Sequence, residues 1–526
     1  MRYATSFSFT VNPSFLILEE LYSNSYYIIL TLEVKMVSDL STFQKHYENQ
    51  EKRLDETRLF QKAALSALYH DKWASRSIKV EGLKGFEGLR ELPFTEPNDI
   101  RLAWENHPIE DIILTKNVAV WHCTSGSMGK KKWIPWSYND YTLSRLEIGK
   151  LLFETGLKPD DIMLSITLPA PFISGSLPYR ILESSGSIGY PIEQIITAPT
   201  SMQEVFELLV KRQPTVMLST PSLALRIAEE IGKRTPSILK KLAEEKKSLK
   251  IKLGSFITRL VSIKPRHIFK KLRIGFFTAE SLDPYRSMLQ DLWGLEAFDL
   301  YGFTEGFGVG YECSEHNGLH FPSLNCILEI IPESELKKEE NNPDYAPKTV
   351  LLSEAEKGLT GELVVTDFKE ALPLIRYRIR DLVKTVQTDE CSCGCFSPKL
   401  KVLGRSDDIV NMGVIRFSST SINQVLKSDM KNGKVDKWGI YISRKGYKPL
   451  LKLRIQPSEV KDEKLFREEI FSNLLNIEAF KTGFEAGLFI LEPFEFTDQL
   501  NLEVIGQGKT RLIRYSPDYN KPLNRD

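Results

Sequence analysis

The stretch Val118-Ala119-Val120-Trp121-His122-Cys123-Thr124-Ser125-Gly126-Ser127-Met128-Gly129-Lys130 joins a short apolar run to a glycine-rich loop. The apolar run predicts a buried strand that leads directly into the loop. Glycines let the backbone approach an anion closely, and hydroxyls, backbone amides and lysine can bind phosphate oxygens. The spacing does not fit a Walker A loop, and on this stretch alone an ordinary polar turn stays open as an alternative.

Size and composition limit the possible classes of protein. A chain of 526 residues is too long for one ordinary core, so we expect two to four structural units. Its hydrophobic and charged fractions, 42% and 26%, are typical of globular proteins. The net charge of +1 gives no overall field that attracts nucleic acid or acidic lipid, so we expect neither as a partner. We expect a cytoplasmic protein, and a homodimer stays open.

The first 35 residues are a separate question. Residues 15–34 are apolar and aromatic, but Glu19, Glu20 and Asn24 interrupt them, and they match neither a membrane helix nor a secretory signal. Met36 offers an alternative start. We therefore expect residues 1–35 to be a spurious or disordered extension.

Strand and helix patterns alternate after residue 118. Short apolar runs at 162–166, 216–219, 272–277 and 297–300 are separated by helical patterns such as 202–212. This alternation predicts an α/β fold with a largely parallel sheet covered on both faces. Close-set strands around 322–403 predict an antiparallel β unit, and a smaller α+β region follows.

Four further motifs follow the loop in order: Tyr301-Gly302-Phe303-Thr304-Glu305, Tyr377-Arg378-Ile379-Arg380-Asp381-Leu382, Gly404-Arg405-Ser406-Asp407-Asp408 and Gly508-Lys509-Thr510-Arg511. Together with the loop they resemble the adenylate-forming superfamily of acyl-CoA synthetases and adenylation domains. Segments 220–225, 312–320, 372–378 and 391–394, with His122, are similar to the phenylacetate–CoA ligase and coenzyme F390 synthetase branch. The resemblance implies an adenylation domain over 36–405 and a small mobile C-terminal domain over 406–526.

The resemblance also implies a role for each motif. ATP would be held at the phosphates, the adenine and the ribose, and Glu305 would help to bind Mg²⁺. Thr304 would contact the α-phosphate, Lys509 would enter the site on the mobile domain, and Asp407 would be the hinge. The implied nucleotide contacts are Thr124, Ser125, Gly126, Ser127, Gly129, Lys130, Thr278, Ala279, Glu280, Tyr301, Gly302, Asp381 and Arg405.

A cluster of cysteines and histidines predicts a metal site. Cys313 with His316, and Cys391 with Cys393, would complete a tetrahedral zinc set, with Cys395 and His320 as spare candidates. The Cys-x-Cys spacing is tighter than that of zinc fingers, and a cysteine-bearing turn beside an unrelated histidine is the alternative.

The function that the resemblance implies is activation of a carboxylic acid with ATP, followed by transfer to coenzyme A. Trp136 and Tyr138 are candidates for an aromatic acid pocket, which would suit an aryl or arylacetic acid, although core packing explains them equally well. Met128 and Lys131 replace the threonine and proline usual in the family loop, and Arg380 replaces a glycine. Two alternatives stay open: adenylylation of a deazaflavin without coenzyme A, and a catalytically weakened nucleotide-binding protein.

Overall fold

The computed structural model describes residues 49–124, 132–187, 191–198, 202–232, 264–279, 281–283, 285–322, 325–342, 344–405, 409–412, 415–428, 430–500, 502–505, 509–516 and 518–519. The prediction for residues 1–35 therefore lies outside the described residues. No helix in the described ranges is long and apolar enough to span a bilayer.

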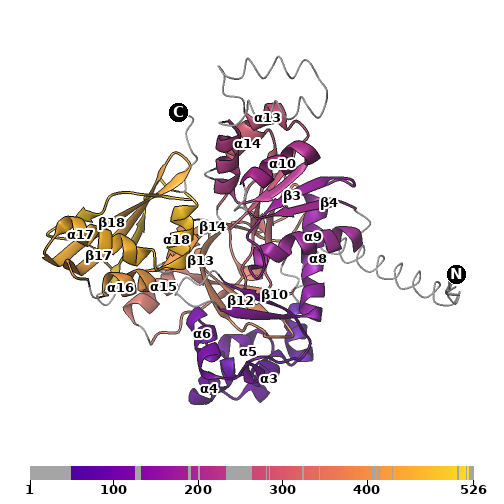
Figure 1. Cartoon of the computed structure of the whole chain (residues 1–526). Helices are drawn as coiled ribbons and strands as arrows, with labels where there is room; N and C mark the ends of the chain where they lie inside the picture. The colour runs from indigo at the N-terminus through magenta and orange to yellow at the C-terminus, as the bar shows by residue number, and fades with distance from the viewer. Residues whose placement is uncertain are drawn as a thin grey trace, which may run out of the picture.

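A single sheet of 12 strands forms the centre of the molecule (Figure 1). One half is parallel, as the alternation of strand and helix predicted. In spatial order its strands are β4 (Glu193–Thr197), β3 (Ile162–Ile166), β5 (Val216–Ser219), β6 (Ile274–Thr278) and β7 (Glu296–Tyr301). Only β4 among these strands had not been predicted, because its sequence Glu-Gln-Ile-Ile-Thr carries a short and weak apolar signal.

Helices cover both faces of this parallel half. One face packs on α8 (Tyr138–Glu154) and α9 (Ile173–Ser187) through a core that includes Ile148 and Ile181. The other face carries α10 (Met202–Arg212), a helix at 221–232, α13 (Pro265–Ile268) and α14 (Arg286–Trp293). In α10 the buried residues recur one helical turn apart, which is why this segment forms an amphipathic helix: Val205, Phe206, Leu209 and Val210.

The same sheet continues as an antiparallel half beyond β7. Its strands in spatial order are β8 (Gly310–Glu312), β9 (Leu319–His320), β14 (Lys399–Arg405), β13 (Tyr377–Gln387), β12 (Thr360–Asp367), β10 (Cys326–Pro332) and β11 (Val350–Leu351). Helix α15 (Glu333–Asn341) connects β10 to β11. The predicted parallel and antiparallel units are therefore one hydrogen-bonded sheet, and the strand direction reverses at the junction of β7 and β8.

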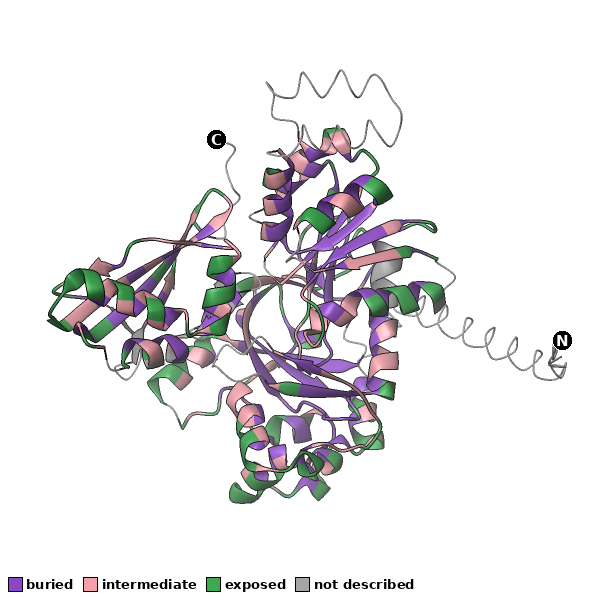
Figure 2. Ribbon diagram, viewed as in Figure 1, coloured by how far each residue is buried: buried purple, intermediate pink, exposed green. Residues whose placement is uncertain are grey.

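N-terminal helices close the antiparallel half from below in Figure 1. They are a helix at 49–56, α3 (Leu59–Ala63), α4 (Ala67–Ser75), α5 (Gly85–Glu91), α6 (Pro97–Asn106) and α7 (Ile109–Ile112). Their core is shared with residues from 307 to 400. The Tyr69 hydroxyl donates to the carbonyl of Pro373 at 2.7 Å, and that of Thr95 donates to the carbonyl of Ile375 at 2.6 Å. Figure 2 shows this sheet as an almost continuous buried layer.

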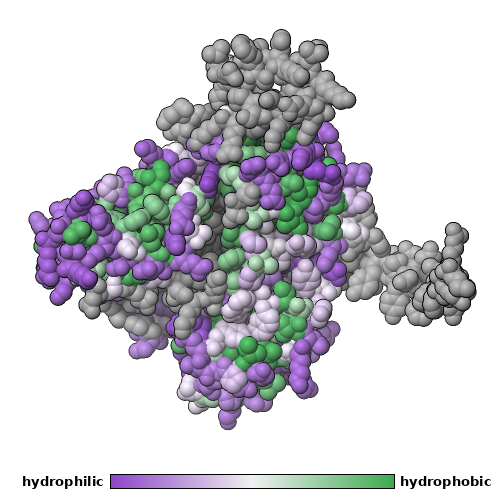
Figure 3. All heavy atoms as spheres, in the orientation of Figure 1, coloured by the Kyte–Doolittle hydropathy of each residue, from purple (hydrophilic) through white to green (hydrophobic). Residues whose placement is uncertain are grey.

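A third core cluster draws only on residues from Val410 onward. It lies in the C-terminal part, which contains β15 (Ile409–Met412), β16 (Ile415–Ser418), α16 (Ser419–Leu426), β17 (Gly433–Lys445), β18 (Lys448–Val460), α17 (Glu463–Leu474), α18 (Glu478–Glu485), β19 (Ile490–Leu491), β20 (Glu495–Phe496), β21 (Glu503–Ile505), β22 (Lys509–Arg511) and β23 (Ile513–Tyr515). Hydrophilic side chains dominate the outer edge of this part in Figure 3.

Candidate active site

The predicted phosphate loop connects two strands of a hairpin. β1 (Val118–Cys123) pairs antiparallel with β2 (Trp133–Ser137), and Cys123 lies opposite Trp133. The amide of Thr124 donates to the carbonyl of Lys132 at 3.1 Å, which closes the hairpin at the base of the loop. The loop residues 125–131 lie outside the described residues, so the predicted contacts of Ser125, Gly126, Ser127, Gly129 and Lys130 stay predictions.

Glu305 lies where the chain leaves β7, and it is 8% exposed. The Lys132 ammonium donates to its Oε1 at 2.6 Å, and the Tyr377 hydroxyl donates to the same oxygen at 2.9 Å. Burial raises the pKa of Glu305, but the charge and hydrogen bond of Lys132 outweigh it, so the pKa is lowered overall. Lys132 was not predicted as a site residue. It nevertheless contacts Glu305, the predicted magnesium ligand.

Three predicted nucleotide contacts, Tyr301, Asp381 and Arg405, meet near Glu305, with Asp381 at their centre. The Tyr301 hydroxyl donates to Oδ2 of Asp381 at 2.6 Å, and Arg405 donates to Oδ1 at 3.1 Å. Asp381 and Arg405 are directly opposite each other in the pairing of β13 with β14. The structure therefore gathers three separate sequence motifs around one carboxylate.

The remaining predicted contacts on this edge follow parallel strands. Thr278 ends β6, which is the neighbour of β7, and Ala279 follows with a φ of 73°. Glu280 lies outside the described residues. Thr304 is half-buried next to Glu305, and Gly302 is exposed, with no atom within 4 Å of where a Cβ would stand. The carboxyl ends of these strands meet at the edge where the sheet changes direction, which is where ligands bind in open α/β sheets.

Arg380 explains one departure from the family pattern. Its φ of 70° lies in the left-handed region that favours glycine, the residue common at this position in the superfamily. The guanidinium donates to Glu96 at 2.5 Å and to Glu362 at 3.3 Å. These two bonds offset the cost of placing a non-glycine residue in that conformation.

The two candidates for an acid pocket do not lie together. Trp136 is 2% exposed and belongs to the hydrophobic core, whereas Tyr138 is 71% exposed at the start of α8. A strand-to-helix turn directs the two side chains to different environments, and their role in binding the acid stays a prediction. Trp136 packs edge-on against His122 and Phe307, with ring centroids 5.9 and 5.3 Å apart.

A cluster of three cysteines and one histidine lies beyond β8. One possible ligand atom from each of Cys313, His320, Cys391 and Cys393 lies within 4.8 Å of the others. This set differs from the prediction in one member, because His320 takes the place of His316. His316 instead contacts Glu312 at 3.2 Å and Glu296 at 3.1 Å.

The geometry of His320 suits a metal ligand. Its Nδ1 lies 2.9 Å from the carbonyl of Ser397, and its Nε2 lies 3.4 Å from Sγ of Cys393. A hydrogen bond from Nδ1 to a carbonyl leaves Nε2 as the free donor of an electron pair, which is how metal-binding histidines are usually oriented. The sequence signal for His320 was its place in the same motif, four residues after His316.

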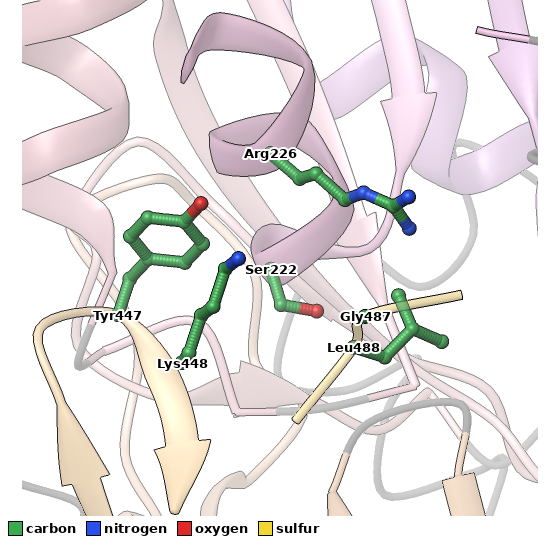
Figure 4. Close-up of a pocket in the computed structure, with 6 residues that line it drawn as sticks. All are labelled: Ser222, Arg226, Tyr447, Lys448, Gly487 and Leu488. Atoms are coloured by element: carbon green, nitrogen blue, oxygen red, sulfur yellow. The ribbon is translucent and has the colours of Figure 1, made fainter. Parts of the chain in front are cut away.

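The C-terminal part contacts the parallel half through the tip of the β17–β18 hairpin. The Arg444 guanidinium lies between two aromatic rings, 4.4 Å from the ring centre of Tyr285 and 4.2 Å from that of Tyr519. The Tyr447 hydroxyl donates to Glu229 on the helix at 221–232. Figure 4 shows a small pocket at this junction, lined from both sides by Ser222, Arg226, Tyr447, Lys448, Gly487 and Leu488.

The two remaining predicted residues belong to this C-terminal part. Lys509 begins β22, which pairs with β21, and Asp407 lies outside the described residues. The side chain of Lys509 lies outside the described residues, so its predicted entry into the site stays a prediction.

Comparisons with known proteins show which family and fold the chain resembles. The family described as AMP-binding enzyme matches residues 28–365. A phenylacetate-coenzyme A ligase of Pseudomonas putida is 28% identical over 396 residues, covering 71% of this chain and 76% of that protein. One from Escherichia coli K12 is 24% identical, covering 74% and 78%. A crystal structure of 2-hydroxyisobutyryl-CoA ligase with 2-HIB-AMP and CoA, in its thioester-forming state, has a TM-score of 0.65 and 18% identity and covers 89% of this chain and 90% of its own.

Proposed function

Because the chain belongs to the AMP-binding enzyme family, we propose that it activates a carboxylic acid with ATP and passes the acyl group to coenzyme A. A carboxylate oxygen attacks the α-phosphorus of ATP, the bond to the β-phosphate breaks, and pyrophosphate leaves. The thiol sulfur then attacks the acyl carbon, a proton is released, and AMP leaves. The observation that carries the proposal is the meeting of Tyr301, Asp381 and Arg405 beside the Lys132–Glu305 pair.

Asp381 is suited to hold the ribose. An ionised carboxylate accepts hydrogen bonds at both oxygens, which matches two neighbouring hydroxyls. Tyr301 and Arg405 fix its orientation from either side, so the ribose meets a preset acceptor. Tyr301 also packs on Phe321, with ring centroids 5.5 Å apart, which supports its proposed place against the adenine.

Glu305 fits the proposed role of magnesium ligand. Both of its hydrogen-bond donors, Lys132 and Tyr377, use Oε1, so Oε2 has no partner among the described residues. Carboxylate oxygens are the usual protein ligands of Mg²⁺. The metal would offset the negative charge of the phosphates, while Lys132 would supply a second positive charge at the base of the loop.

We assign a structural zinc ion to Cys313, His320, Cys391 and Cys393. Three thiolates and one imidazole form a normal closed tetrahedral zinc set. The Ser397 carbonyl and the turn at Gly394, whose φ is 84°, hold the ligands in position. Since Cys313 follows β8 and the other cysteines precede β14, the metal would tie together the edge where the sheet changes direction.

We further propose a domain boundary at 405/406, with adenylation residues over 36–405 and a mobile domain over 406–526. The separate core from Val410 onward supports it. Asp407 would be the hinge, and Lys509 would reach the phosphates when the domain rotates. A cytoplasmic location and a homodimer stay proposals.

An aryl or arylacetic acid is the proposed substrate class. Acid-dependent exchange of pyrophosphate with ATP, measured over a panel of acids, tests the first half-reaction, and release of AMP on addition of coenzyme A tests the second. Exchange that requires a deazaflavin in place of an acid would overturn the proposal in favour of adenylylation. Absence of exchange with both would support a nucleotide-binding protein without this activity.

A further inference from the structure

Helix α9 carries a buried arginine, Arg180, that pairs with no carboxylate among the described residues. Arg180 is 6% exposed, and its Nε is fully buried with no hydrogen bond. No carboxylate in the described ranges lies within ion-pair distance of its guanidinium. Unpaired buried charges are costly, and arginine is almost never fully buried unless it is paired. A buried arginine without a carboxylate partner is therefore a candidate for binding an anionic ligand.

The groups nearest to Arg180 add positive charge and hydrogen-bond donors. Its guanidinium lies 5.5 Å from the centre of the Trp136 ring, and the Lys369 ammonium lies 5.5 Å from the same ring. The indole Nε1 of Trp136 is buried and has no acceptor. Burial, then the charges of Arg180 and Lys369, lower the pKa of His122 to about 4, so this imidazole is neutral at neutral pH.

The acidic groups that face Arg180 neutralise it only in part. Glu147 on α8 accepts a hydrogen bond from Asn325 at 3.5 Å, and its Oε2 is buried without a partner. Burial raises the pKa of Glu147 to about 7. Tyr141, one and a half turns earlier on α8, has a raised pKa through burial and is neutral. A buried cation therefore faces a carboxyl group that is partly protonated at neutral pH.

This cation lies close to the reacting end of the proposed site. Lys369 donates to the backbone carbonyl of Glu305 and contacts the Trp136 ring on which Arg180 also lies. Trp136 is on the strand that follows the phosphate loop, and His122 is on the strand that precedes it. The indole ring of Trp136 thus lies between Arg180 and Lys369, and Lys369 binds the backbone of Glu305, the proposed magnesium ligand.

We propose that Arg180 binds a second anionic group of the acid, remote from the carboxylate that is adenylated. The preferred substrates are then aryl or arylacetic acids with a second carboxylate. Lys132 is held by Glu305 at the base of the phosphate loop, which leaves Arg180 for the distal group. This inference rests on the proposed function and narrows its substrate class.

The test is acid-dependent pyrophosphate exchange with three matched acids. These are phenylacetic acid, 4-(carboxymethyl)benzoic acid and the neutral amide 4-carbamoylphenylacetic acid. A charged hydrogen bond in a buried site changes binding by roughly tenfold to a hundredfold, so the diacid should show a kcat/KM higher by that factor, mainly through KM. Arg180→Gln should abolish this preference by lowering kcat/KM for the diacid to the value for phenylacetic acid, whereas Arg180→Lys should retain part of it.

Arg145→Gln on the neighbouring α8 is the matched control. Its side chain is 31% exposed and lies 3.9 Å from Glu183, so the preference should not change. Arg180→Met reports on folding separately, because an apolar replacement of an unpaired buried charge should keep or raise the unfolding temperature. A rise in unfolding temperature of the unchanged protein with the diacid, absent with the amide, would give independent support.

Equal use of the three acids by the unchanged protein would overturn the inference and leave the proposed function intact. The same follows if Arg180→Gln lowers exchange equally with every acid. If no acid of any kind supports exchange, the proposed function fails, and the inference fails with it.

Discussion

Replacing Lys132 with methionine should impair the first half-reaction more than it impairs the fold. The ammonium is 2.6 Å from Oε1 of Glu305, and the two side chains are 16% and 10% exposed. Removing one partner of a buried ion pair costs about 3–5 kcal/mol of stability. Tyr377 retains its bond to the same oxygen at 2.9 Å, so we expect a loss at the lower end, about 3 kcal/mol.

The effect on catalysis has two parts. Loss of one fixed charge that faces the developing charge of the reaction typically lowers kcat by about 10²–10³. The second part concerns Glu305, whose pKa is raised by burial but held below its ordinary value of 4.5 by Lys132. In the unchanged protein the carboxylate is therefore ionised above pH 4.5, and its contribution is lost only as the pH falls through the lowered pKa. In Lys132→Met burial is opposed only by the hydrogen bonds from Tyr377 and from the backbone, so the carboxylate should become protonated at a higher pH.

Acid-dependent pyrophosphate exchange, titrated with Mg²⁺ between pH 5 and pH 9, measures both parts. We expect a lower maximal rate, and an apparent magnesium affinity that falls at a higher pH than in the unchanged protein. Lys384→Met, an exposed position on the same strand as Tyr377, is the control. An unchanged rate and magnesium dependence in Lys132→Met, in folded protein, would refute the proposed role of the pair.

Three more predictions concern metal, pH and domain contact. Elemental analysis should find zinc in the unchanged protein. Cys391→Ser should lose this zinc and unfold at a lower temperature, whereas His316→Ala should keep it; equal zinc in both variants would contradict the ligand set. Because the pKa of Glu147 is raised to about 7 in the folded state, its contribution to stability is present below pH 4.5 and is lost as the pH rises through about 7. Relative to the unchanged protein, Glu147→Gln should therefore have a free energy of unfolding in urea that is higher by about 1–3 kcal/mol at pH 8 and unchanged near pH 4. An equal gain at both pH values would contradict the assignment. Arg444→Ala removes two cation–π contacts worth about 0.5–2 kcal/mol each, one of them with Tyr285, so amide exchange of α14, which begins after Tyr285, should speed up, whereas Arg454→Ala on the same hairpin should leave it unchanged; equal effects would contradict a role of the hairpin tip.

The fold could be predicted from the sequence where local patterns are strong. The helix predicted over 202–212 forms at those residues, because its apolar side chains recur at the helical period. The strand at 216–219 also forms as predicted, because a short apolar run between turn residues is typical of a buried strand. The union of the parallel and antiparallel strands into one sheet was not predicted, because the pairing of β7 with β8 depends on a hydrogen-bond ladder that leaves no periodic signal.

In the candidate site, too, local motifs were predictive, whereas features that depend on long-range packing were not. The three motif residues Tyr301, Asp381 and Arg405 do contact one another, because each is fixed by its place in a strand, and their contact with the nucleotide stays a prediction. The choice of His316 over His320 failed, because both lie within eight residues of Cys313 and only the hairpin between β8 and β9 decides which imidazole faces the thiols. Arg180 carried no signal at all, since nothing in a sequence tells a buried arginine from an exposed one.

The core shared between the N-terminal helices and the antiparallel strands has a consequence for synthesis of the chain. Tyr69 finds its hydrogen-bond partner 304 residues later, and Gln50 finds the carbonyl of Cys326 276 residues later. At about 5–20 residues per second, a ribosome needs roughly 15–60 s to make the intervening chain. During that interval the apolar faces of α3 to α6 have no partner strands to cover them. Nascent chains stalled before residue 370 should therefore bind chaperones through their first hundred residues and release them once β13 has emerged.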